Sequence, residues 1–142
     1  IERIREQDSR IKDNELRHRY TIAKYFRDFH ASEISSFMKE KNLDPSLLNE
    51  TFKNEKTIIR FFRTMPTSYC LCELSFYRDM QKTRKVDPND LNDIMSLSIA
   101  LPYCDIVVTE RIWRSPILHR KLDKIRPTKV VIGANDLIQI LV

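Results

Sequence analysis

Three carboxylates in the last third of this 142-residue sequence are spaced so that they could act together: Asp90, Asp93 and Glu110. Asp90 and Asp93 are three residues apart, so in a helix they share a face, where like charges repel unless a counter-ion is present. Hard carboxylate oxygens suit Mg²⁺ or Mn²⁺. Such a metal, beside a phosphodiester, activates a water and neutralises the charge of the transition state. The pattern therefore predicts a metal site that hydrolyses phosphodiesters.

The elements around these acids predict how Glu110 reaches the two aspartates. Along a helix expected over 88–101 and closed by Pro102, the rise from Asp90 to Pro102 is about 18 Å. The β-branched run at 105–109 is expected to return as a strand that covers roughly 17 Å by Glu110. The helix and the strand are expected to run in opposite directions over nearly equal lengths. We therefore expect Glu110 to lie at the level of the two aspartates, at the carboxyl end of the strand, where open α/β sheets bind their ligands.

A purely structural explanation competes at each position. Asp87 fits a helix N-cap, and Asp90 gains roughly 0.3 to 1 kcal/mol from the helix dipole in the first turn. Asp93 lies beyond the reach of that dipole, which favours a functional role. Thr109 and Glu110 could be a strand former and a solvated strand end. The functional prediction therefore depends mainly on Asp93 together with Glu110.

A basic stretch follows the candidate site. Between positions 111 and 129 there are seven Lys or Arg against one acid, an excess of six that exceeds the net charge of +5 of the whole chain. Such a cluster is typical of a phosphate-binding surface, although a solvated helix face has the same composition. The candidate nucleic-acid contacts are Arg111, Arg114, Arg120, Lys121 and Lys124.

Length and composition favour one soluble, mainly helical domain over 1–142, helical over 1–86 and α/β over 87–142. Glycine occurs once, at Gly133, and residues that favour helices abound. We find no apolar run of membrane-spanning length and no signal-peptide pattern, so we expect a cytoplasmic protein without a membrane partner. The sequence starts at Ile1 in what looks like a charged helix, which suggests a fragment of a longer protein.

Periodic apolar residues predict the helices of the first half. The stretch 14–41 predicts one long helix, bent near His30. The Asp44-Pro45 pair opens a helix or a pair of helices that runs to about Arg63. Another helical pattern follows Pro66.

The second half alternates between helices and short strands. The helix that starts at Pro88 should close at Pro102. A helix over 111–124 then separates the strand at 105–109 from a second apolar run, KVVIG. Strands separated in this way form a right-handed βαβ crossover and a parallel sheet. A final helix, capped by Asn135, completes the pattern.

The segment NDLNDIMSLSIALPYCDIVVTERIW resembles the C-terminal half of a PIN-type ribonuclease domain. That family has an acid that opens a helix, an alanine within the helix, a small residue followed by Asp, a β-branched strand, and then Thr followed by acids. The matching positions are Asp93, Ala100, Cys104-Asp105 and Thr109-Glu110. The KVVIG run fits the last strand of the family.

The resemblance implies a PIN-like three-layer α/β/α fold and cleavage of RNA that depends on Mg²⁺ or Mn²⁺. It implies metal carboxylates at Asp93 and Glu110, an auxiliary acid at Asp90, and a ligand-positioning role for Thr109. The sequence departs from the family because no strand with an acid is recognisable near Ile1. It also has Arg111 where the family often has Asp or Asn.

Two alternatives to a ribonuclease remain open on the residues alone. One is a non-catalytic α/β module that binds nucleic acid through the basic stretch, and nothing in the sequence separates RNA from DNA. The other is a partner-binding module that forms a homodimer or binds an antitoxin-like protein.

Overall fold

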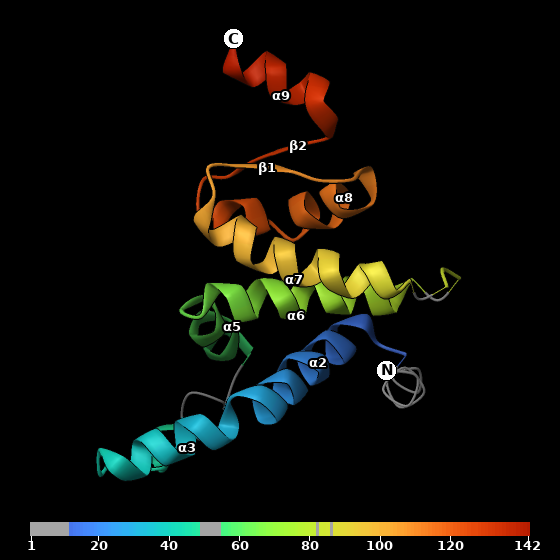
Figure 1. Cartoon of the computed structure of the whole chain (residues 1–142). Coiled ribbons are helices and arrows are strands. Elements are labelled where there is room, and N and C mark those ends of the chain that lie inside the picture. Colours follow the sequence, from blue (N-terminus) through green and yellow to red (C-terminus); the bar gives the residue numbers. More distant parts are fainter. Residues whose placement is uncertain (1–11, 49–54, 82, 86) are drawn as a thin grey trace. The chain divides into compact units, whose positions relative to one another are not determined.

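A computed structural model describes residues 12–48, 55–81, 83–85 and 87–142 of the chain (Figure 1). These residues are mostly helical, with a small two-stranded parallel sheet near the C-terminus, as the sequence predicts. The contacts divide the chain into two compact units, Ile1–Phe61 and Phe62–Val142. The second unit includes helices from before residue 86, because the helix before that position packs along the helix after it.

The predicted bend in the first long helix is confirmed as a break. Helix α2 (Asn14–Phe29) ends and α3 (Ala31–Glu40) begins on either side of His30, whose φ of −125° and ψ of −24° leave the helical region. A short helical turn follows at 46–48, where the Asp44 carboxylate accepts the amide of Ser46 at 2.8 Å. The expected continuation over 49–54, like the charged helix expected at the N-terminus, lies outside the described residues.

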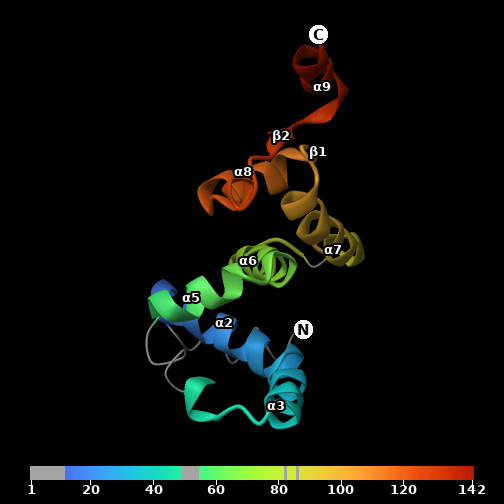
Figure 2. The ribbon, with the colours of Figure 1, turned by 90° about the vertical axis from the view of Figure 1, so that its left-hand side faces the viewer.

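The second unit begins within α5 (Glu55–Arg63) and continues with α6 (Pro66–Met80), which has its proline at the first helical position as predicted. Helix α7 (Pro88–Tyr103) runs beside α6 in Figures 1 and 2. Apolar side chains of both helices form part of the core, among them Cys70, Cys72, Leu74, Ile94 and Leu101.

Pro102 does not end α7, contrary to the prediction, and lies inside its last turn. Inside a helix, a proline removes the amide that would bond to the carbonyl four residues earlier, and α7 continues past Pro102 by one residue, Tyr103. The end of α7 is also capped from outside, because the buried hydroxyl of Thr128 lies 2.8 Å from the carbonyl of Leu101 and 3.0 Å from that of Cys104. These contacts satisfy carbonyls that the end of a helix leaves unpaired.

The sheet consists of β1 (Ile106–Val108) and β2 (Lys129–Val131), which pair in parallel as predicted. In register, Val107 lies opposite Val130. Further backbone hydrogen bonds extend the ladder at both ends, from Lys129 to Asp105 at 2.9 Å and from Thr109 to Val131 at 3.0 Å. The sheet therefore places the carboxyl end of β1, followed by Thr109, beside the carboxyl end of β2.

The helix that connects the two strands is shorter than the predicted helix over 111–124. Helix α8 (Arg111–His119) includes Pro116, and the 3₁₀ turn η1 (Leu122–Lys124) follows after a break. The break falls at Lys121, whose φ of 56° is left-handed and incompatible with a continuing helix. In Figures 1 and 2, α7 and α8 lie together on one side of the sheet.

The last helix, α9 (Gly133–Leu141), starts two residues before Asn135, so Asn135 is not its cap. The chain turns into α9 at Gly133, whose φ of +75° is readily adopted only by glycine. The carboxylate of Asp136 accepts the amide of Ile132 at 3.1 Å and so satisfies a donor at the start of the helix. No helix in the described part of the chain is both long and apolar enough to cross a membrane.

Candidate functional site

A hollow of about 490 Å³ lies at the carboxyl end of β1. Asp93, Thr109 and Glu110 contribute to its wall, from α7 and from the residues that follow β1. The rest of the lining is mainly apolar and comes from α7, β1, α8 and the turn into α9: Ser96, Leu97, Val108, Trp113, Ile132 and Gly133. The structure therefore brings together three of the four residues expected at the site and leaves out Asp90.

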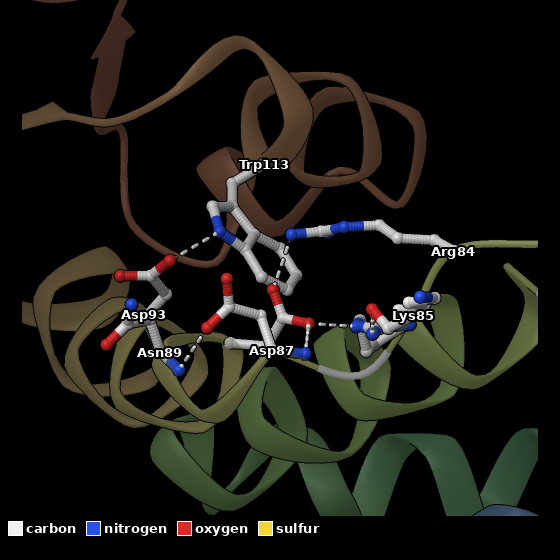
Figure 3. A network of polar contacts seen from close by, with 8 residues as sticks. Arg84, Lys85, Asp87, Asn89, Asp93 and Trp113 are labelled. Atoms are coloured by element: carbon white, nitrogen blue, oxygen red, sulfur yellow. Dashed lines mark hydrogen bonds and ion pairs between the residues drawn. The ribbon is translucent and has the colours of Figure 1, made fainter.

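Asp93 is half-buried in this wall and accepts one side-chain hydrogen bond. The indole Nε1–H of Trp113 donates to its Oδ2 at 3.0 Å (Figure 3). Trp113 itself is 1% exposed, so the donor is fixed by the core of the unit. Nothing in the sequence indicates this contact, because Trp113 lies twenty residues after Asp93.

Glu110 is exposed at the junction of β1 and α8. It occupies the N-cap position of α8, but its side chain makes no capping hydrogen bond. Its carboxylate is therefore not committed to the helix that it precedes. Thr109 lies next to it, half-buried, with its backbone amide bonded to β2.

Asp90 faces a different environment, although it lies one helical turn before Asp93. Arg78 of α6 donates to its Oδ2, and Arg84 donates to its Oδ1 at 2.6 Å. The amide of Asp87 also donates to Oδ2, at 3.2 Å, and completes a capping box at the start of α7. The expected role of Asp90 as an auxiliary metal acid does not agree with this arrangement, because both of its oxygens are taken by arginines.

The charge state of Asp90 follows from these contacts. Burial raises the pKa of its carboxyl group. The hydrogen bond from Arg78, the amide of Asp87 and the positive charges of Arg78 and Arg84 act in the opposite direction and outweigh burial, so that the pKa lies below its usual value. Asp90 is therefore an ionised partner of two guanidinium groups.

No group of three or more His, Cys, Asp or Glu side chains lies close enough to hold a metal ion among the described residues. The predicted three-acid cluster is thus reduced to the pair Asp93 and Glu110. The physical reason is that three residues of helix turn through about 300°, so that Asp90 and Asp93 point about 60° apart. That offset lets Asp90 reach α6 while Asp93 reaches α8.

Of the five candidate nucleic-acid contacts, one is half-buried and the other four are exposed. Arg120 is drawn inward, with its Nε 3.4 Å from the buried carboxylate of Glu73 and its guanidinium 5.3 Å from the ring centroid of Phe76. Lys124 lies 3.0 Å from Asp123 but is mostly exposed. The other three basic side chains are exposed: Arg111, Arg114 and Lys121.

Comparison with known proteins gives no relative: no protein-family model, no curated protein and no solved structure matches this chain.

The donor set of the hollow is compatible with a hard divalent cation. Among the described residues, the side-chain hydrogen bond to the Asp93 carboxylate comes from the uncharged indole N–H of Trp113. The carboxylate of Glu110 makes no capping hydrogen bond to α8. Thr109, which also lines the hollow, carries a hydroxyl oxygen. Two carboxylates are sufficient for Mg²⁺ when water molecules and substrate phosphates complete its coordination.

Proposed function

We propose that this chain carries a PIN-like ribonuclease site, in which Asp93 and Glu110 bind Mg²⁺ or Mn²⁺ at the hollow and RNA phosphates complete the coordination. The observation that supports the proposal is that these two acids, from separate elements, line the same hollow at the carboxyl end of β1. Parallel α/β sheets bind ligands at this edge.

Each side chain has a defined role in the proposal. Asp93 and Glu110 hold the cation, which supplies an activated water and neutralises charge on the scissile phosphate when bound. Thr109 orients a ligand beside them. Arg111 and Arg114, exposed on the first turn of α8, attract the phosphate backbone. Lys121 and Lys124 extend this attraction beyond α8.

Cleavage of end-labelled single-stranded RNA tests the proposal. In the presence of Mn²⁺ the chain should cut the RNA, and EDTA, Asp93→Asn or Glu110→Gln should each abolish cleavage. Asp105→Asn is the matched control, because Asp105 is an exposed acid at the opposite end of β1. The assignment would be overturned by the absence of Mn²⁺-dependent cleavage, or by equal cleavage with the Asp93→Asn variant.

A non-catalytic nucleic-acid-binding module is the second candidate. It is favoured by the absence of a third carboxylate at the hollow within the described residues and by the exposure of Arg111, Arg114 and Lys121. Such a module binds RNA or DNA with an affinity that falls as salt rises and is unchanged by EDTA. If neither nucleic acid binds at low salt, a partner-binding role as a homodimer or with an antitoxin-like protein is the better explanation.

A further inference from the structure

Two aspartates on the same helix receive very different hydrogen bonds. Asp90 is bonded to two guanidinium groups, whereas Asp93 is bonded to the neutral indole N–H of Trp113. The arginines neutralise Asp90, while the indole orders Asp93 and leaves its charge intact. The difference decides which of the two carboxylates can attract a cation.

The bond from Trp113 restricts the orientation of the Asp93 carboxylate. The terminal torsion of an aspartate is broad, so a free carboxylate samples many orientations. A donor on Oδ2 selects those in which Oδ2 faces the indole, and Oδ1 is then the oxygen left for a cation. Since Trp113 is buried and part of α8, this selection holds as long as α8 is packed against α7.

Arg84 contacts both Asp90 and the ring of Trp113, the residue that donates to Asp93. Its Nη2 donates to Asp90 at 2.6 Å, and its guanidinium carbon lies 6.0 Å from the ring centroid of Trp113 (Figure 3). Asp90 thus holds Arg84 next to the indole. The contacts of Arg84 are with Asp90 and with the Trp113 ring, and not with Asp93.

We infer that Trp113 is a positioning residue that holds the Asp93 carboxylate ready for a divalent cation through its Nε1–H bond to Oδ2. This inference depends on the proposed metal site at Asp93 and Glu110. Removing a side chain that donates a hydrogen bond to a metal ligand typically lowers metal affinity or activity by 10- to 100-fold.

The first test compares Mn²⁺ affinity in the full chain by electron paramagnetic resonance of free Mn²⁺. Trp113→Phe keeps a buried aromatic ring but removes the donor, and it should weaken Mn²⁺ binding by about 10-fold or more. Ile117→Val is the control, because Ile117 is fully buried on the same helix and its truncation costs stability without removing a donor to Asp93. It should bind Mn²⁺ as the wild type does.

A second measurement needs no substitution of the tryptophan. Trp113 is the single tryptophan of the chain, so its indole N–H gives one signal in a ¹H–¹⁵N spectrum. Mg²⁺ should shift this signal in the wild type, with a midpoint equal to the dissociation constant, and should leave it unchanged in Asp93→Asn.

The outcomes separate the inference from the proposed function. Absence of any Mn²⁺ or Mg²⁺ binding by the wild type overturns the metal site and, with it, the inference. Two results would leave the metal site in place and overturn the role of Trp113. One is metal binding by the wild type without a shift of the indole signal, and the other is wild-type metal affinity in a folded Trp113→Phe variant. A weakened affinity in Ile117→Val equal to that of Trp113→Phe also overturns it.

Discussion

Arg78 and Asp90 form a buried ion pair that joins α6 to the first turn of α7. Both residues are less than 5% exposed, and Arg78 also donates to the carbonyl of Lys85 at 2.6 Å. The pair therefore connects two helices and the segment between them. Removing one partner of such a pair leaves a buried charge uncompensated, which costs more than the pair itself contributes.

Asp90→Ala should destabilise the chain by about 3 to 5 kcal/mol because it leaves Arg78 buried without its counter-charge. Urea unfolding followed by circular dichroism measures the change. Asp105→Ala, at an exposed position, should change stability by less than about 0.5 kcal/mol. Equal effects of the two substitutions would contradict the importance of the buried pair.

The stabilisation from Asp90 should depend on pH below about 4. Because the pKa of Asp90 is lower in the folded chain than the usual value near 3.9, its contribution is complete above that usual value and disappears as the pH falls through the folded pKa. The stability difference between wild type and Asp90→Asn should therefore be constant from pH 5 to 7 and shrink at pH 3. Urea midpoints at pH 7, 5, 4 and 3 measure this. A difference that grows on acidification would contradict the assigned direction.

Thr128→Val should destabilise the end of α7 by about 1 to 3 kcal/mol. The substitution keeps the shape of the side chain and removes the hydroxyl that bonds to the carbonyls of Leu101 and Cys104. Amide hydrogen exchange should accelerate most at the last turn of α7. Thr83→Val, at an exposed position, is the control and should have no such effect.

The three cysteines should differ in reactivity toward iodoacetamide at pH 8. Burial and the nearby Glu73 raise the pKa of Cys70 to about 12, and the same causes raise that of Cys72 further. Cys104 is exposed at the end of α7. Since the thiolate is the reactive form, native protein should be alkylated at Cys104 alone and unfolded protein at all three, as read by peptide mass spectrometry. Modification of Cys70 or Cys72 at the rate of Cys104 would contradict this burial.

Arg111→Ala combined with Arg114→Ala should reduce the salt dependence of RNA binding. Each phosphate contact contributes about 0.7 to the slope of log K against log salt for a single strand, so the double variant should lose roughly 1.4. Arg120→Lys is a useful comparison because Arg120 is paired with Glu73. It should leave the slope unchanged.

The parallel sheet and the presence of Asp93 and Glu110 around one hollow could be predicted because both follow from short-range patterns. Two β-branched runs with a helix between them favour parallel pairing. The rise of a helix and of a strand are fixed by backbone geometry, so comparing their lengths places Glu110 near Asp93 without knowledge of side-chain packing.

The partners of Asp90 and Arg120 could not be predicted in the same way. Arg78 lies twelve residues before Asp90 on another helix, and their contact depends on how α7 is rotated against α6. Arg120 was expected to face solvent because it stands in a basic stretch, but Glu73 of α6 lies beneath it. The local sequence does not predict which acid from another part of the chain will pair with a basic side chain.

The walls of the hollow come from positions 93–97, 108–113 and 132–133, which are far apart in the chain. Pairing of β2 with β1 closes a loop of about twenty residues, and the last two wall positions follow β2 directly. Local opening of β2 would therefore remove one side of the hollow while α6 and α7 remain packed. A ligand that fits the hollow must bind the paired form and should slow hydrogen exchange in β2, a strand that it need not touch.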